Sequence, residues 1–197
     1  MAAAPNMYKP KRHIVIDVET LHTRRNAAII DIAAVVVDLN NSANHGAEFS
    51  IQIRPSAYDA MTDTEFASNQ DTVAFHHKND PEFIPFCEAH GVSLQEAAQQ
   101  FCEWIRTWSD SVELHLWSQG KDFDFPILEN MIHQTGETIP WAKSRVHCLR
   151  DAVWLNPASR IKTSEPVAHK ALPDARFEAK QLQVLIGGSS WYQRLFK

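Results

Sequence analysis

Two acidic residues, Asp17 and Glu19, lie two positions apart at the end of an apolar run rich in β-branched residues. In an extended chain, residues i and i+2 project from the same face, so this spacing places both carboxylates side by side at the end of a buried strand. Two adjacent like charges in such a place are costly unless a cation binds them. The pair therefore indicates a divalent metal site, and the alternative is an ordinary pair of acids in an exposed loop.

A third acid, Asp124, lies in the segment 120–128 (GKDFDFPIL), between a predicted strand and a predicted helix. A turn at that point can present an acid at the edge of a sheet. The alternative is a helix cap, because Asp is a preferred N-cap residue. Asp122 suits the cap better than Asp124, which stands two residues before Pro126, a residue tolerated in the first turn of a helix.

The last candidate pair is His169 and Asp174, five positions apart, at the start of the final predicted helix. The alternative is a solvated His with an Asp that compensates the helix dipole. His147 and Asp151, four positions apart, form a rival pair. Acids at the ends of several elements of one sheet are a stronger signal than any one of them alone, and hard oxygen ligands suit Mg²⁺ or Mn²⁺.

The elements that must position these acids alternate along the chain. Strands are predicted at 13–17, 27–38, 48–54, 112–117 and near Val146, and helices at 71–78, 93–108, 125–133, 149–155 and 172–186. The sequence Ser-x-x-Glu that starts at Ser93 is a capping box at the beginning of the helix over 93–108. Gly136 ends the helix over 125–133. Three strands followed by helices that alternate with two more strands predict an α/β domain with a mixed sheet.

The composition of the 197-residue chain, with 44% hydrophobic and 22% charged residues, predicts one folded domain behind a flexible lead-in over residues 1–11. No apolar run is long enough to cross a membrane, and the start of the chain lacks the apolar core of a signal peptide. The three cysteines have no CxxC spacing. A cytoplasmic protein without a disulfide framework is therefore expected.

The net charge of −5 by itself argues against a nucleic-acid partner, because phosphate binding usually leaves a basic footprint. The charge is unevenly distributed, however. Residues 26–140 carry a net −14, whereas residues 1–25 and 141–197 together carry +9. Because these basic flanks contain the first and third acidic motifs, the distribution is compatible with a nucleic-acid partner.

Taken together, Asp17-x-Glu19, Phe123-Asp124 and His169-x4-Asp174 resemble the DEDD 3′→5′ exonucleases, in the DEDDh subgroup whose fifth residue is His. The segments 16–20 (IDVET), 26–30 (NAAII), 123–128 (FDFPIL) and 167–169 (VAH) are similar to the phage exonuclease A type and to related bacterial exoribonucleases. The resemblance covers about residues 13–186. It implies a ribonuclease H-like fold, with a central mixed five-stranded sheet flanked by helices, in a single exonuclease domain over residues 12–197.

The resemblance also implies removal of nucleoside 5′-monophosphates from a 3′ end by two divalent metal ions, Mg²⁺ or Mn²⁺. Its metal ligands would be Asp17, Glu19, Asp124 and Asp174, and His169 would be the general base. Single-stranded 3′ ends of DNA are the expected substrate, with RNA as the alternative. Two competing hypotheses are a non-catalytic nucleic-acid-binding relative and an editing subunit of a polymerase.

Substrate contacts are expected from two segments that follow the first motif. Thr20 and Leu21 would face the terminal nucleotide, and Phe75 and His76 stand where relatives carry tandem Trp, with core and surface roles as the alternative. Relatives are often dimers, so a homodimer stays open. The aromatic C-terminal end would pack either on a partner subunit or on the body of the protein; it contains Trp191, Tyr192, Leu195 and Phe196.

Overall fold

The centre of this computed structural model is a five-stranded sheet with the strand order β3-β2-β1-β4-β5. The structure describes residues 10–37, 46–109, 112–162 and 169–187. The strands are β1 (Lys11–Thr20), β2 (Ile29–Val37), β3 (Glu48–Gln52), β4 (Glu113–Ser118) and β5 (Val146–Cys148). The first three strands pair antiparallel, whereas β4 is parallel to β1 and to β5. The predicted mixed α/β sheet is therefore confirmed.

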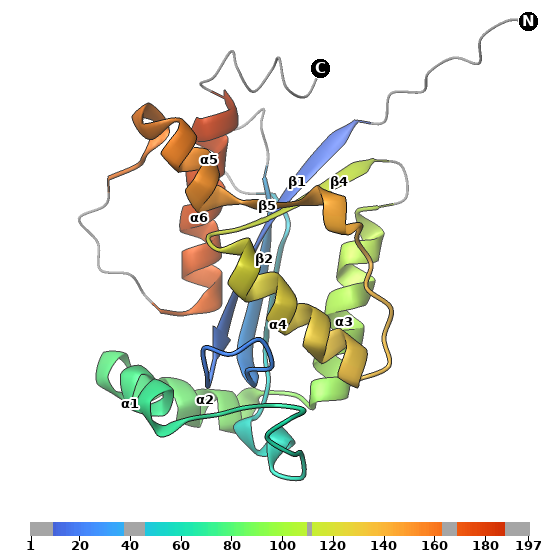
Figure 1. The fold of residues 1–197 in the computed structure, drawn as a ribbon, viewed down its shortest axis with the longest axis vertical. Helices are drawn as coiled ribbons and strands as arrows, with labels where there is room; N and C mark the ends of the chain where they lie inside the picture. The colour runs from blue at the N-terminus through green and yellow to red at the C-terminus, as the bar shows by residue number, and fades with distance from the viewer. Residues whose placement is uncertain (1–9, 38–45, 110–111, 163–168, 188–197) are drawn as a thin grey trace, which may run out of the picture.

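Helices cover both faces of this sheet (Figure 1). The helices are α1 (Gln70–Asn79), α2 (Phe83–His90), α3 (Leu94–Thr107), α4 (Lys121–Gln134), α5 (Leu149–Leu155) and α6 (Ala171–Gly187). α5 and α6 lie on one face and α3 and α4 on the other, while α1 and α2 lie near one end of the strands. This layering matches the ribonuclease H-like fold that the resemblance implied.

The alternation of β1 directs its side chains to two different cores. Ile14 and Ile16 belong to the core shared with α3 and α4, whereas Val15 belongs to the core shared with α6. Because side chains alternate along a strand, Asp17 and Glu19 project from the same face as Val15. The strand therefore carries both acids toward α6, the helix that bears Asp174.

Three local features differ from the sequence-based expectations. Helix α2 was not expected because prolines punctuate its segment, but Pro85 lies in its first turn, where proline is tolerated. Helix α4 begins at Lys121 rather than at residue 125, and its N-cap is Gly120, so the structure rules out the alternative in which Asp122 or Asp124 caps this helix. β1 begins at Lys11, the last residue of the expected lead-in.

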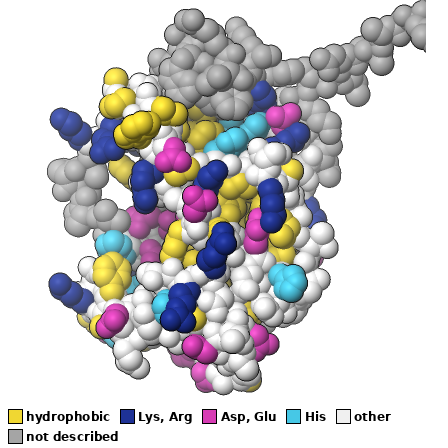
Figure 2. Space-filling view, viewed as in Figure 1, with side chains coloured by type: hydrophobic (Ala, Val, Ile, Leu, Met, Phe, Trp, Pro, Cys, Tyr) yellow, Lys and Arg dark blue, Asp and Glu magenta, His cyan; other side chains and the backbone are white. Residues whose placement is uncertain are grey.

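Other expectations concern the ends and the surface of the molecule. Residues 1–9 of the lead-in and the aromatic C-terminal end with Trp191 and Tyr192 lie outside the described residues. None of the helices in the described segments has the length and apolar character needed to span a bilayer. On the face seen in Figure 2, the described Lys and Arg side chains are mixed with acidic ones and do not form a separate basic patch.

Candidate metal and nucleic-acid site

Asp17 and Glu19 occupy the end of the central strand. In the β1–β2 ladder, Asp17 lies opposite Ala33 and Glu19 opposite Asp31, and the register shifts between Glu19 and Thr20. Such an irregularity bends a strand and re-aims the side chains beside it. The two predicted acids therefore lie side by side on one face of β1, at the point where regular pairing ends.

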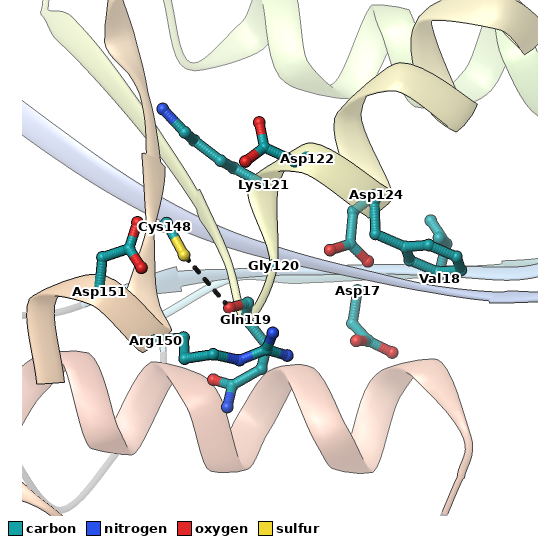
Figure 3. A pocket seen from close by; sticks show the side chains of 11 residues that line it. Asp17, Val18, Gln119, Gly120, Lys121, Asp122, Asp124, Cys148, Arg150 and Asp151 are labelled. Carbon is teal, nitrogen blue, oxygen red and sulfur yellow. Dashed lines mark hydrogen bonds between the residues drawn. The ribbon is translucent and has the colours of Figure 1, made fainter. Parts of the chain in front are cut away.

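Asp124 reaches the same place from the neighbouring strand. β4 runs parallel to β1, and Gly120 then starts α4, so the first turn of this helix lies over the end of the sheet. Figure 3 shows the Asp124 side chain beside Asp17. Burial raises the pKa of Asp124 to about 6, and nearby donors, first among them the Ser118 hydroxyl, limit that rise.

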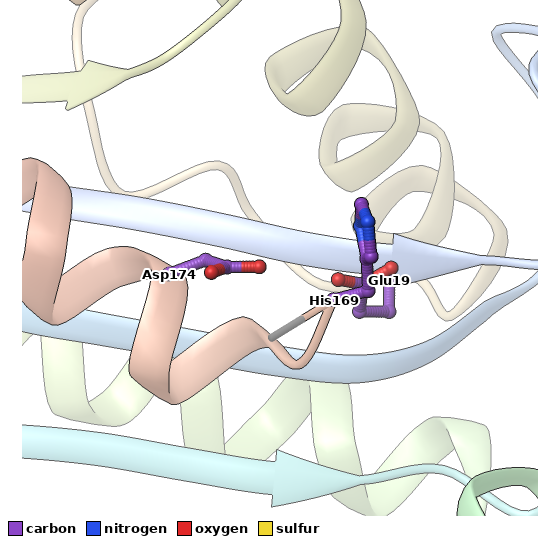
Figure 4. Close-up of side chains that lie close together, drawn as sticks. All are labelled: Glu19, His169 and Asp174. Atoms are coloured by element: carbon purple, nitrogen blue, oxygen red, sulfur yellow. The ribbon is translucent and has the colours of Figure 1, made fainter. Parts of the chain in front are cut away.

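His169 and Asp174 complete the site from the start of α6. Glu19, His169 and Asp174 each offer a ligand atom, and these atoms lie within 4.8 Å of one another (Figure 4). The backbone of His169 has a φ of 48°, in the left-handed region that is uncommon for residues other than glycine. Lys170, the next residue, forms a salt bridge with Asp80 at 2.7 Å, which ties this loop to the region between α1 and α2.

The electrostatics of the site call for cations. Burial raises the pKa of Asp17 well above its usual range, and the charges of Glu178 and Asp124 raise it further. Burial, with Asp174 as the largest neighbouring charge, raises the pKa of Glu19 to about 8. A divalent ion would stabilise the charged form of these clustered carboxylates, because it offsets both their burial and their mutual repulsion. Oxygen donors are the ligands that Mg²⁺ and Mn²⁺ prefer. The described residues therefore fit the metal ions that the resemblance implies.

Glu178 is a buried acid that none of the sequence motifs includes. It lies on α6 one turn after Asp174, it is 7% exposed, and its Oε2 atom has no hydrogen-bond partner in the described part of the chain. Burial raises its pKa well above the usual range, and Asp124 and Asp174 raise it further. The available signal was the spacing of four residues from Asp174, which puts two acids on one helix face.

Two pockets open at the acids. The first, of about 460 Å³, is lined by Asp17 and Asp124 together with Gln119, Lys121 and Arg150 (Figure 3). Its walls come from the β4–α4 turn and from the start of α5. A carboxylate floor with two cationic side chains at the wall suits a metal-bound phosphate group.

The second pocket, of about 500 Å³, lies on the Glu19 side and is lined by Thr20, Phe75, His76 and Phe123. Phe75 is 43% exposed and Phe123 is 36% exposed, so both rings offer a face to a ligand. His76 is buried, and its Nε2 donates to the carbonyl oxygen of Thr20 at 2.9 Å. His76 thus supports the wall of the pocket by holding the strand end.

Leu21 does not line this pocket. Its side chain belongs to the core around α3 and α4. Its backbone N–H donates to Ala28 at 2.8 Å, and its carbonyl accepts from Asn69 at 2.9 Å. The expected contact of Leu21 with the terminal nucleotide is therefore not supported, because its amide is already used to fix the loop after β1.

In the rival pair, His147 contacts another histidine. His147 Nε2 lies 2.8 Å from His115 Nδ1, and the two rings stack. Asp151 lines the pocket that contains Asp17. The structure thus groups His169, rather than His147, with the carboxylates.

The chain matches known proteins at the level of family and of fold. A family profile described as "3'-5' exoribonuclease Rv2179c-like domain" matches residues 12–186. Among curated proteins, none matches this sequence.

Solved structures of exonuclease I are similar in fold. The E. coli exonuclease I–ssDNA complex with bound zinc superimposes with a TM-score of 0.68 at 14% identity, over 95% of this chain and 43% of that one. Exonuclease I from Methylocaldum szegediense gives a TM-score of 0.65 at 16% identity, over 94% of this chain and 42% of that one. The chain thus spans less than half of the length of these structures. Because the family profile covers most of the sequence, the chain belongs to the family of Rv2179c-like 3′–5′ exoribonuclease domains.

Proposed function

We propose that this protein is a 3′→5′ exonuclease that hydrolyses the terminal phosphodiester of a nucleic acid and releases nucleoside 5′-monophosphates. One observation carries the proposal: Glu19 and Asp174 lie with His169 in one cluster, and Asp17, which shares a face of β1 with Glu19, lines a pocket together with Asp124. Two divalent ions, Mg²⁺ or Mn²⁺, held by these acids would activate the attacking water and stabilise the leaving 3′ oxygen. Membership of the exoribonuclease family supports the same reaction.

The residues of the chain divide the remaining work. His169, next to Glu19 and Asp174, takes the proton of the attacking water. The pocket with Phe75 and Phe123 takes the terminal nucleoside, because exposed aromatic rings stack on any base. Lys121 and Arg150 hold the phosphates of the strand next to the scissile bond.

RNA is the substrate that we propose, and DNA is the second candidate. The DNA expected from the sequence has support from the fold, since E. coli exonuclease I was solved with oligonucleotides such as dA16. That likeness rests on 14% identity, whereas the exoribonuclease profile matches residues 12–186 of this chain. Matched RNA and DNA oligonucleotides, single- and double-stranded and labelled at the 5′ end, would show which substrate is shortened faster.

The decisive test of the activity uses Asp17→Asn in the full chain. With Mg²⁺ or Mn²⁺, the wild type should shorten a single-stranded oligonucleotide from its 3′ end and release mononucleotides. Asp17→Asn should lose at least about 100-fold in rate, because loss of a metal ligand exceeds the usual effect of a residue that only supports one. Asp59→Asn, a change of an exposed acid, is the control and should keep full activity. An Asp17→Asn protein as active as the wild type would reject the assignment.

Two further proposals concern the state of the protein. The described cysteines, Cys87, Cys102 and Cys148, are all unpaired, which supports a reducing, cytoplasmic location. We also propose that residues 12–197 form a single domain. This domain is proposed to form a homodimer. Sedimentation equilibrium would reject the homodimer if it gave the mass of one 22.4 kDa chain.

A further inference from the structure

We propose that Glu178 is a fifth carboxylate of the metal site and helps to bind the cation on the Asp17–Asp124 side. This inference rests on the proposed function, because it assigns a new residue to the same site. None of the sequence motifs includes Glu178. The case depends on where the side chain lies, on its unused oxygen atom and on the charges around it.

The position of Glu178 follows from the helix that carries it. Residues four apart lie one above the other on a helix, so Glu178 lies on the same side of α6 as Asp174. That side packs against β1 and β2, where Asp17 projects from the sheet. The negative charge of Glu178 also raises the pKa of Asp17, which agrees with this packing.

The surroundings of Glu178 leave one oxygen without a protein partner. The backbone N–H of Gln119 donates to its carboxyl group, and Arg150 favours its charged form. Oε2, in contrast, is fully buried and unpaired among the described residues. A buried carboxylate oxygen without a donor destabilises the fold, so a group that satisfies this oxygen is expected in the working protein.

A divalent cation satisfies that oxygen better than any other ligand the site could accept. A neutral donor would leave the charges of Asp17, Asp124 and Glu178 uncompensated in a place shielded from water. Arg150 lines one pocket with Glu178 and another with Asp17 and Asp124, but it supplies a single positive charge against three carboxylates. A cation between Asp17 and Glu178 would neutralise both acids at once, and Glu178 would strengthen a metal position that otherwise depends on Asp17 and Asp124.

The competing role for Glu178 is only to anchor the β4–α4 turn through Gln119. Glu178→Gln separates these two roles, because glutamine keeps the size and the acceptor oxygen for the Gln119 N–H but loses the charge. Glu103→Gln is the matched control, since Glu103 lies exposed on α3 and bonds only Gln99 among the described contacts. Mn²⁺ titrations of the purified full chain, without nucleic acid, would be followed by electron paramagnetic resonance.

We expect Glu178→Gln to weaken Mn²⁺ binding at one position by about tenfold or more, and Glu103→Gln to bind as the wild type does. The rise in melting temperature on addition of Mn²⁺ should also be smaller for Glu178→Gln, while its metal-free melting temperature should not fall. Mn²⁺ binding equal to that of the wild type would overturn the role of Glu178, and so would a lower metal-free melting temperature with an unchanged response to Mn²⁺.

A measurement on the wild type keeps the test independent of any variant that does not fold. Anomalous scattering from Mn²⁺ soaked into crystals should place an ion bonded to Glu178 directly or through one water molecule. Bound Mn²⁺ ions that all lie farther from Glu178 would overturn the proposal. Weaker Mn²⁺ binding in Glu178→Gln, together with a wild type that cuts no oligonucleotide, would reject the exonuclease and keep the site. An active wild type with unchanged Mn²⁺ binding in Glu178→Gln would keep the exonuclease and reject the role of Glu178.

Discussion

The carboxylate of Asp31 accepts a hydrogen bond from the backbone N–H of Ala171 at 3.1 Å, across 140 positions of the sequence. Asp31 lies in β2, directly opposite Glu19, and Ala171 is the first residue of α6. Gln52 donates to the other oxygen of Asp31 at 2.9 Å and keeps the carboxylate in place. One buried side chain therefore ties the strand pair that carries Glu19 to the helix start that carries His169 and Asp174.

Removal of this tie should lower activity without removal of a metal ligand. We expect Asp31→Ala to reduce the turnover rate about 10- to 100-fold, because residues that support ligands typically have effects of that size. Asp31→Asn keeps an oxygen that can accept from the Ala171 N–H, and it should lose less. Steady-state rates on one oligonucleotide would compare the three proteins, and equal rates in all of them would contradict this positioning role.

His169 should affect the rate of hydrolysis far more than metal binding. A general base contributes about 10²–10⁴-fold, so His169→Ala should lose activity by that factor. Its ring also offers a nitrogen within 4.8 Å of ligand atoms of Glu19 and Asp174, which makes metal coordination the competing role. Calorimetric Mn²⁺ titration separates the roles. An affinity equal to that of the wild type supports the base, and a parallel loss of affinity and activity would show that His169 is a ligand.

Phe75 should contribute to substrate binding through base stacking. Stacking on an aromatic side chain contributes about 1–3 kcal/mol per base, so Phe75→Ala should raise KM about tenfold with a smaller change in kcat. Phe86→Ala is a suitable control, because Phe86 is 47% exposed on α2 and lines a different pocket. Equal KM values for the two variants would show that the ring of Phe75 is not a stacking platform.

The stability of the metal-free protein should fall as pH rises from about 6.5 to about 8. Burial and the neighbouring acids raise the pKa of Glu19 to about 8, so the folded chain keeps a proton that the unfolded chain has already released. Stability is lost as pH rises through the folded pKa, by about 1.5 kcal/mol for this group over that range. Urea unfolding with a chelator should show the decrease, Glu19→Gln should show less of it, and Mn²⁺ should abolish it. A flat profile with chelator present would contradict the prediction.

A second pH effect, of opposite sign, should arise from stacked histidines at the other end of the sheet. His13 lies opposite His115 in the β1–β4 ladder, and His115 bonds His147. Burial and the charge of His115 lower the pKa of His147 to about 4, so below its ordinary pKa of 6.5 the unfolded chain takes up a proton that the folded chain does not.

Acidification from about pH 6.5 to about pH 5 should therefore cost about 1.5 kcal/mol through His147 alone. The difference in unfolding free energy between the wild type and His147→Gln isolates this contribution, because the acids affect both proteins equally. His133→Gln, a change on the exposed end of α4, is the control and should leave the profile of the wild type unchanged. A difference that does not vary with pH would contradict the prediction.

The acids that the sequence identified share one property: their positions follow from secondary structure that short stretches of sequence predict. Alternation along a strand fixes the side of β1 that Asp17 and Glu19 share, and a helix start after a strand fixes Asp124 at the edge of the sheet. These rules require only residues that are neighbours in the sequence, so the places of these acids at strand and helix ends could be predicted from the sequence alone, and so could the mixed sheet. The roles of the acids as metal ligands came from the family resemblance and stay a prediction. The same rules extended to five strands and to most helices.

The features that the sequence did not reveal depend on distant contacts. Glu178 looks like a solvent-facing acid on an amphipathic helix until the packing of α6 on β1 is known. Leu21 looks available for a ligand until its bonds to Ala28 and Asn69 are seen. Helix α2 was hidden because a proline signals a break unless it falls in the first turn, as Pro85 does.

The order in which the elements occur along the chain has a consequence for biosynthesis. β1 supplies its two acids early, α4 adds a third, and α6 brings Asp174 and Glu178 only after residue 171. A chain still attached to the ribosome and lacking α6 has a sheet but only part of the metal-binding set, and it also lacks His169. A growing chain therefore cannot assemble the full set of proposed metal ligands, or place the proposed general base beside them, until α6 has emerged and docked.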